Sequence, residues 1–197
     1  MILAIDTTSE YGSLALCEGD LVVEEVSIHS PEGFAHVVFR ELQALLARNS
    51  VRIAEIDRYA SASGPGSFTG VRVGLALAKG LAFATGKKVV TVSVLEAVAS
   101  LGTSQLRAAV IEARRGEVYA ALYDAGLRIV LPEVVTTLDR FRAMLPAESI
   151  EFVKMDPPRA LAGAIGKIAA LREGEMPEAI DANYVRRSDA ELFWKDG

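Results

Sequence analysis

Short apolar runs separated by polar turns open this chain. Three of them lie within the first 28 residues, at 1–5, 13–17 and 21–28, and Glu18-Gly19-Asp20 separates the last two. Runs of this length, bounded by turn residues, are typical of strands. The pattern therefore predicts three successive strands that form an antiparallel meander, with a hairpin between the second and the third.

Two longer segments carry apolar residues at helical spacing. The first, at 31–49, begins with Ser30-Pro31-Glu32, which combines an N-cap residue, a proline at the first helical position and an acid in the first turn. The second, at 69–85, follows a glycine-proline loop. Both segments are predicted to be helices with more apolar surface than one contact face requires.

The rest of the chain alternates strands and helices. We expect strands at 59–62, 89–92, 106–113, 118–123, 126–135 and 150–153, and helices at 93–99, 137–145 and 160–171. Thr103-Ser104-Gln105 is the predicted boundary between an N-terminal lobe, 1–102, and a C-terminal lobe, 103–197. The aromatic residues Tyr184, Phe193 and Trp194 predict that the tail, about 180–197, docks back on the body.

The glycine-proline loop joins a predicted strand directly to the second long helix. Gly64 and Gly66 permit backbone angles that other residues resist, and Ser67 is suited to cap the helix. Because a helix N-terminus attracts anions, this loop is a potential phosphate site, together with Asp6 and Thr7 at the end of the first strand. The other interpretation is turn geometry alone, with the Asp6 carboxylate capping its own turn. The loop is not a P-loop, since no Gly-Lys-Ser/Thr follows the glycines.

The helix predicted at 69–85 has small residues at every fourth position. Gly70, Gly74, Ala78 and Ala82 form one ridge, along which another backbone could pack closely. The other side is apolar as well, and a helix that is apolar nearly all round is buried on more than one side. One side is therefore expected to lie on the protein's own sheet, and the other to be covered elsewhere in the chain or by a partner.

Composition and charge narrow the class of protein. Hydrophobic residues make up 51% of the chain and charged residues 24%, which suits a globular protein with a substantial core. The net charge of −5 argues against a protein that grips nucleic acid alone, because such domains carry a basic excess. The start, MILAIDTTSE, lacks the basic segment of a secretory signal, and no uncharged apolar run is long enough to span a membrane. A cytoplasmic protein is expected.

The sequence predicts neither a catalytic residue nor a metal ligand set. The single cysteine, Cys17, excludes an intrachain disulfide and a cysteine-cluster metal site. The two histidines, His29 and His36, have no accompanying ligand set and belong to no His-Glu-x-x-His motif. A metallopeptidase is therefore set aside.

Four segments resemble one known family along essentially the whole chain: MILAIDTTSEYGSLAL, GPGSFTGVRVGLALAKGLA, IEARRGEVYAALY and ANYVRRSDAELFWK. They are similar to the bacterial TsaB (YeaZ) family. This family is the non-catalytic paralogue of TsaD in the system that makes N6-threonylcarbamoyladenosine at position 37 of tRNAs reading codons that begin with A. The resemblance implies an α/β fold of two actin-like lobes (the ASKHA, ribonuclease H-like fold) with a shortened second lobe.

The resemblance also implies a role and partners. The chain would be a scaffold or activator subunit that pairs with TsaD, with the small ATPase TsaE joining them. It would form a homodimer in isolation and meet tRNA only through the complex. No cofactor would be tightly bound, and the complex interface would be the place for any ATP or ADP. The two long helices would make the protein contact, through Phe34, Val38, Leu42, Leu45, Gly70, Val71, Gly74, Leu75, Ala78 and Ala82.

One departure from the catalytic paralogue favours a binding subunit. The paralogue holds a metal with His-x-x-x-His, and an ungapped alignment places Val94 and Val98 at those positions, where valine cannot ligate a metal. The alternative is an ATP-binding or ATP-hydrolysing enzyme of the actin-like or sugar-kinase class. Such an enzyme would use Asp6 or Glu112 as its carboxylate, and Arg114-Arg115-Gly116 in place of a second phosphate loop.

Overall fold

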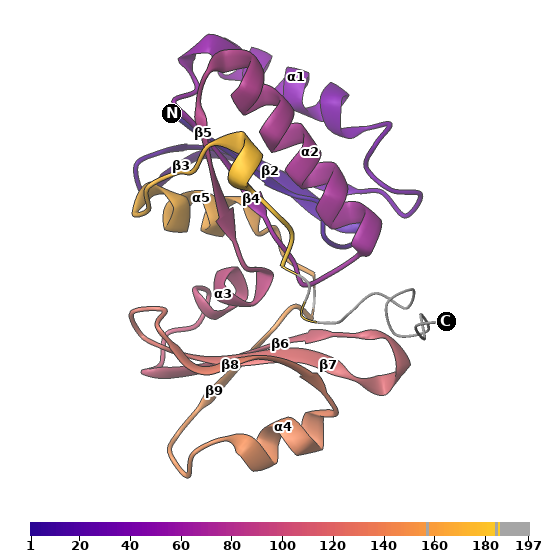
Figure 1. Cartoon of the computed structure of the whole chain (residues 1–197), viewed down its shortest axis with the longest axis vertical. Helices are drawn as coiled ribbons and strands as arrows, with labels where there is room; N and C mark the ends of the chain where they lie inside the picture. The colour runs from indigo at the N-terminus through magenta and orange to yellow at the C-terminus, as the bar shows by residue number, and fades with distance from the viewer. Residues whose placement is uncertain (157, 184, 186–197) are drawn as a thin grey trace, which may run out of the picture.

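The structure is a computed structural model that describes residues 1–156, 158–183 and 185. Figure 1 shows two lobes, each built on one sheet. The expectations for Tyr184, Phe193 and Trp194 lie outside the described residues.

Five strands form the sheet of the first lobe, in the order β3-β2-β1-β4-β5. Their bounds are Ile2–Asp6 for β1, Tyr11–Glu18 for β2, Leu21–His29 for β3, Arg58–Ala62 for β4 and Lys88–Val92 for β5. The antiparallel pairs β1–β2 and β2–β3 confirm the predicted meander. Since β1 pairs in parallel with β4, the carboxyl ends of these two strands meet at one edge of the sheet. This edge carries Asp6 and the glycine-proline loop.

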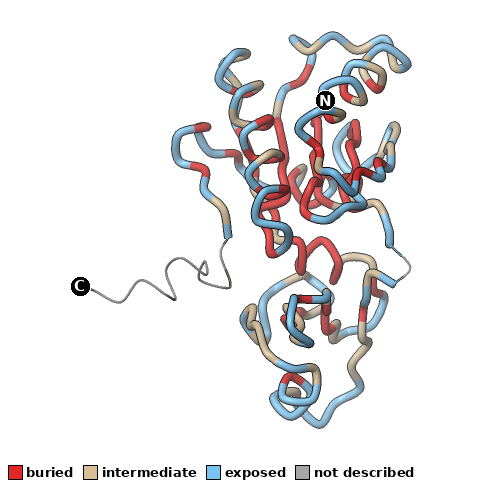
Figure 2. The backbone as a smooth tube through the Cα atoms, turned by 90° about the vertical axis from the view of Figure 1, so that its right-hand side faces the viewer, coloured by how far each residue is buried: buried red, intermediate tan, exposed pale blue. Residues whose placement is uncertain are grey.

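Helices cover both faces of the first sheet. The helices α1 (Val38–Arg48) and α2 (Phe68–Thr85) lie on one face and share a core with apolar side chains of β1 and β2. The helix α5 (Ala162–Ala170) packs on the opposite face. Figure 2 shows the buried residues concentrated in the centre of this lobe, between these helices.

The helix α1 begins later than the sequence pattern predicts. Ser30-Pro31-Glu32 enters a turn instead, in which Gly33 has a φ of 94° and the Ser30 hydroxyl donates to the Gly33 carbonyl oxygen at 2.6 Å. Because the Ser30 hydroxyl is hydrogen-bonded within this turn, Ser30 does not act as the N-cap of α1. Phe34 still packs into the core, ahead of the helix. A short 3-10 turn, η1 (Ile53–Glu55), then leads to β4.

The second sheet has the strand order β8-β7-β6-β9. Its bounds are Leu106–Glu112 for β6, Val118–Asp124 for β7, Ile129–Thr136 for β8 and Glu151–Lys154 for β9, with a 3-10 turn, η2 (Arg114–Gly116), between β6 and β7. The helix α4 (Leu138–Met144), which Thr137 caps, buries Phe141 against one face. The helix α3 (Val94–Ala99) lies on the other face, between the lobes. The expected α/β fold of two lobes is confirmed.

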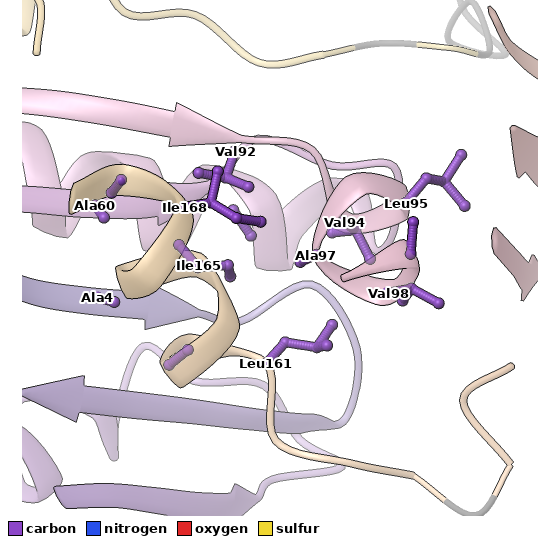
Figure 3. Packing of buried hydrophobic residues seen from close by; sticks show 14 of the residues in the cluster. Ala4, Ala60, Val92, Val94, Leu95, Ala97, Val98, Leu161, Ile165 and Ile168 are labelled. Carbon is purple, nitrogen blue, oxygen red and sulfur yellow. The ribbon is translucent and has the colours of Figure 1, made fainter. Parts of the chain in front are cut away.

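The segment at 160–171, expected in the C-terminal lobe, belongs by its contacts to the first lobe. It forms α5, and the backbone N–H groups of Leu161 and Ala162 donate to the Ser13 hydroxyl oxygen on β2, at 3.0 and 2.9 Å. Figure 3 shows Leu161 and Ile165 of α5 in one apolar core with Val94 of α3. This core continues into the second sheet and joins the two lobes.

After α5 the chain returns along the first lobe as residues 175–183, here called the strap. Glu175 and Val89 exchange two backbone hydrogen bonds, of 2.8 and 2.9 Å, at the outer edge of β5. The short 3-10 turn η3 (Pro177–Ala179) then packs on α2, and Ile180 is buried in the same core.

The helix α2 is the one helix among the described residues whose length and composition would suit a membrane span. Its 18 residues have a mean hydropathy of 1.2. Core helices of soluble proteins can have the same length and hydropathy. In this structure α2 packs one side on β4 and β1, which accounts for much of its apolar character.

Candidate functional site

A cleft of about 1160 Å³ lies between the two lobes. Its first-lobe wall carries Asp6 at the end of β1, and Gly66 and Ser67 at the start of α2. Its second-lobe wall carries Glu112 and Arg114, from the end of β6 and the turn after it. The cleft therefore collects three of the five residues predicted to contact a ligand. Of the four second-lobe residues considered for an ATP-using enzyme it collects Glu112 and Arg114, whereas Arg115 and Gly116 do not line it.

The other two predicted contacts, Thr7 and Gly64, do not line this cleft. Thr7 is buried, and its hydroxyl donates to the carbonyl oxygen of Gly70 on α2 at 2.7 Å. Gly64 has a φ of 103°, and a Cβ there would lie 3.0 Å from the carbonyl oxygen of Asn183. Both positions are explained by the fold, since one holds α2 on the sheet and the other lets the strap pass close by.

Asp6 is almost fully buried at the edge of the cleft. Its Oδ1 accepts hydrogen bonds from the Thr8 N–H at 3.0 Å and from the Thr8 hydroxyl at 2.7 Å. Burial raises the pKa of the Asp6 carboxyl above its ordinary value, although the two bonds from Thr8 oppose the shift. These contacts are those of a carboxylate that closes its own turn, the second of the two interpretations that the sequence leaves open.

The glycine-proline loop also serves the start of α2. Ser67 Oγ accepts from the Gly70 N–H at 3.2 Å, which confirms Ser67 as the N-cap, and the Ser67 N–H donates to the Thr8 carbonyl oxygen at 2.6 Å. A Cβ on Gly66 would lie only 2.5 Å from that same carbonyl oxygen. The loop therefore passes too close to Thr8 for any residue other than glycine at position 66.

Sequence reasoning missed several charged residues of the cleft. Lys154, Asp156 and Arg159 line its second-lobe wall after β9. The available signal is that β9 runs parallel to β6, so the residues that follow both strands reach the same edge of the sheet. The cleft thus carries charges of both signs, and no group of three potential metal ligands occurs among the residues that the structure describes.

Neither histidine belongs to a group of potential metal ligands among the described residues. The ring of His29 stacks on Tyr11, with 4.5 Å between the ring centroids and 13° between the planes, and Tyr11 lines the cleft. His36 is exposed in the segment before α1.

The small-residue ridge of α2 faces the protein's own sheet. A Cβ on Gly70 would lie 2.0 Å from the carbonyl oxygen of Thr7, and one on Gly74 would lie 2.6 Å from Thr7 Oγ1 and 3.2 Å from Ser61 Oγ. Ala78 and Ala82, further along the ridge, are fully buried. The ridge therefore packs α2 on β1 and β4, which is one of the two alternatives that the sequence leaves open. It is not accessible to another protein.

The same correction applies to all ten residues predicted to contact a partner. Each is buried within this chain: Phe34, Val38, Leu42, Leu45, Gly70, Val71, Gly74, Leu75, Ala78 and Ala82. The physical reason is that α1 and α2 each turn their larger apolar side chains and their tightest ridge toward the sheet, where those residues form one core.

A different set of apolar residues lies on the side of these helices that faces away from the sheet. Phe83 is 75% exposed and Phe39 is 58% exposed. We call the set the outer helix face, and it consists of exposed or partly exposed residues: Phe39, Ala47, Val73, Ala76, Gly80, Phe83 and Ala84. A contiguous set of exposed apolar side chains is typical of a contact surface, whereas single exposed apolar side chains are common on any protein.

Comparison with known proteins identifies the family. A family model described as "TsaD: tRNA N6-adenosine threonylcarbamoyltransferase" matches residues 32–171. The chain belongs to this family. Two curated relatives are each named "tRNA threonylcarbamoyladenosine biosynthesis protein TsaB": one from Bacillus subtilis, 35% identical over 125 residues, and one from Escherichia coli, 36% identical over 128 residues. The resemblance to the TsaB (YeaZ) proteins is thereby confirmed.

The extent of these matches differs between relatives. The two TsaB alignments cover 62% of this chain and 55% and 54% of the relatives, so the match spans about half the length of those proteins. An uncharacterised protein of Mycobacterium tuberculosis is 31% identical over 202 residues, which is 96% of this chain and 93% of that protein.

Solved structures agree with the TsaB (YeaZ) assignment. A crystal structure from Pseudomonas aeruginosa, described as an uncharacterized protein with similarity to the peptidase YeaZ, has a TM-score of 0.81 and 26% identity, covering 94% of this chain and 99% of that one. YeaZ from Pseudomonas aeruginosa has a TM-score of 0.77 and 25% identity, covering 93% and 98%. In the present chain Val94 and Val98 are buried in α3 and pack in the core shown in Figure 3.

Proposed function

We propose that this chain is a binding subunit in the biosynthesis of N6-threonylcarbamoyladenosine in tRNA, and that its outer helix face binds a TsaD protein. A second copy of the chain occupies the same face when TsaD is absent. TsaE joins the complex, and tRNA reaches it only through these partners. The chain acts in the cytoplasm and is not an enzyme on its own. The names of the TsaB relatives support the pathway, and the exposed phenylalanines support the contact.

The exposure of Phe83 is the observation that carries this proposal. Along α2, Val73, Ala76, Gly80 and Phe83 recur at spacings of three and four residues, so they form one stripe. The small residues at its centre would let a partner helix approach the α2 backbone, and the phenylalanine at its end would fill a groove on that helix.

The test replaces Phe83 by glutamate and measures binding to TsaD. Because Phe83 is 75% exposed, Phe83→Glu should leave the fold intact. Placing a charge in an apolar contact should weaken binding at least tenfold, since central aromatic anchors dominate interface energies. Calorimetric titration of TsaD, or size-exclusion chromatography of the mixture, gives the affinity or the complex.

Leu171→Glu is the matched control, because Leu171 is 87% exposed at the end of α5, on the opposite side of the first sheet. This variant should bind TsaD like the unmodified chain. If the two variants bind equally well, the outer helix face is not the contact. Sedimentation of the isolated chain extends the test, since Phe83→Glu should also convert a dimer into a monomer.

ATP binding in the cleft is the second candidate function. Asp6, Ser67, Glu112 and Arg114 all line this cleft, which an ATP-using protein of two lobes would require. Calorimetry with Mg-ATP on the isolated chain distinguishes the two candidates. A saturable signal that Asp6→Asn abolishes would favour the ATP-binding function, whereas the binding-subunit proposal expects no such signal without partners.

A further inference from the structure

The strap, residues 175–183, has several contacts with the first lobe. It begins at the outer edge of β5, where it pairs through its backbone. Further along, the Lys79 ammonium group on α2 donates to the carbonyl oxygen of Ile180 at 2.8 Å. At the end of the strap, the Asn183 N–H donates to the carbonyl oxygen of Ser63 at 2.8 Å.

One carboxylate connects the end of the strap to the second lobe. Glu133 lies on β8, and its Oε2 accepts a hydrogen bond from Asn183 Nδ2 at 2.7 Å. Its Oε1 accepts from the hydroxyl of Ser93, the N-cap of α3, and from the hydroxyl of Tyr123 on β7 at 3.3 Å. Glu133 therefore joins the strap, the start of α3 and the second sheet.

These contacts lie where two hollows meet. Asn183 and Val185 line both the cleft between the lobes and a second pocket of about 510 Å³, and Glu133 lies on the wall of that pocket. The ion pair between Glu96 and Arg172 lies on the same wall. Because Glu133 and Asn183 both line this pocket, the hydrogen bond between them can exchange with hydrogen bonds to water.

We infer that Glu133 holds the strap against the second lobe and thereby sets how far the cleft between the lobes opens. The apolar packing of α3 and α5 joins the lobes without Glu133. The contact between Glu133 and Asn183 adds a polar connection beside the cleft. Breaking it would release the end of the strap from the second lobe while both sheets stay intact. This inference is independent of the proposed binding to TsaD.

Hydrogen–deuterium exchange of the full chain tests the inference with Glu133→Ala. The amides of residues 180–183 should exchange at least about tenfold faster, because hydrogen bonds to a charged acceptor are among the stronger ones. The amide of Glu175, which pairs with β5, and the amides of β1 should keep their rates. Spin labels at the exposed positions Gln43 and Ala147, one on each lobe, should give a broader distance distribution in the variant.

Three further variants make the outcome decisive. Asn183→Ala removes an exposed side chain, so it should fold even where Glu133→Ala does not, and it should speed exchange at the end of the strap in the same way. Glu133→Gln keeps an acceptor for Asn183. Its exchange rate at the end of the strap should lie between those of Glu133→Ala and the unmodified chain. Glu148→Ala, an exposed glutamate of the same lobe, should have no effect.

Two results would overturn the inference. In the first, exchange at residues 180–183 is unchanged in both Glu133→Ala and Asn183→Ala. In the second, exchange rises equally in the strap and in β1, which would mean that Glu133 supports the stability of the whole chain rather than the position of the strap.

Discussion

Two glycines of α2 should respond in opposite ways to the same substitution by alanine. Gly70 faces the sheet, where a Cβ would lie 2.0 Å from the Thr7 carbonyl oxygen and 3.3 Å from Ser67 Cβ. Gly80 is exposed, and a Cβ there would meet nothing within 4 Å. The two positions share one helix, so they differ in what the new methyl group would touch and not in secondary structure.

The magnitudes follow from helix propensity and packing. In a helix interior, alanine is more favourable than glycine by about 1 kcal/mol, so Gly80→Ala should stabilise the chain by up to that amount. Gly70→Ala has the same gain, but the methyl group would force α2 away from β1, and overpacking of this kind costs roughly 1–3 kcal/mol or more. Thr7 cannot move aside easily, because its hydroxyl is bonded to the Gly70 carbonyl oxygen. We expect Gly70→Ala to be less stable than Gly80→Ala by about 2–3 kcal/mol.

Urea unfolding followed by far-UV circular dichroism measures this difference. In thermal unfolding it corresponds to a separation of roughly 4–12 °C between the two variants, at about 2–4 °C per kcal/mol for a chain of this size. Equal stability of the two variants would refute the conclusion that the small-residue ridge lies on the sheet. The ridge would then have to be placed, as the sequence also allows, against another protein.

Three further predictions concern buried polar groups. Because burial raises the Asp6 pKa above 3.8, this group favours folding most at pH values below 3.8 and contributes less as the pH rises through its folded pKa. Asp6→Asn, which keeps an acceptor for Thr8, should therefore be more stable than the unmodified chain at neutral pH. The difference between their urea unfolding midpoints should become smaller as the pH is lowered. Burial also raises the pKa of the Cys17 thiol to about 11, so at pH 8 a disulfide reagent should label the folded chain at least about a hundredfold more slowly than the unfolded chain. Ser13→Ala removes the acceptor for two buried N–H groups at the start of α5 and should lower the free energy of unfolding by about 2–4 kcal/mol, measured in urea.

The strands and helix caps could be read from local sequence. The meander of the first three strands, the N-cap Ser67 and the alternation of strands and helices through β5 all depend on residues close together in the chain. The start of α1 shows the limit of this approach. Ser30-Pro31-Glu32 has the composition of a helix start, but Gly33 takes a positive φ and closes a turn that has the same local signals.

The placement of α5 depends on residues far away in the sequence. Neighbouring segments belong to the second lobe, so the sequence favours that lobe for 160–171 as well. The contacts that decide are Ser13 on β2 and Glu25 on β3, whose side-chain oxygens accept from the N–H groups of the first residues of α5. Neither contact has a local signature, because a serine and a glutamate in strands are compatible with many other partners.

The orientation of α2 could not be deduced for a related reason. A helix that is apolar nearly all round offers no polar face to mark the solvent side, and a ridge of small residues suits close packing on a sheet as well as on a partner helix. The deciding fact is the position of Thr7. Its carbonyl oxygen occupies the space that a larger side chain at position 70 would need, and its hydroxyl occupies that space at position 74. The cleft was predictable only in part, since Asp6 and Ser67 follow from strand and helix ends, whereas Lys154 and Arg159 depend on the pairing of β9 with β6.

The two sides of α2 are under different constraints, and this difference bears on function. The inner ridge is fixed by the fit to β1, so its sequence is explained by folding alone. The outer side has no such constraint. Polar residues in place of Ala76, Gly80 and Phe83 would fit these exposed positions equally well and would favour solubility of the chain. Packing of the core therefore does not account for a 75% exposed phenylalanine next to small residues, whereas the proposed contact with another protein would. If Phe83→Glu left stability unchanged and also left every assembly of the chain unchanged, this reasoning from unused apolar surface would fail.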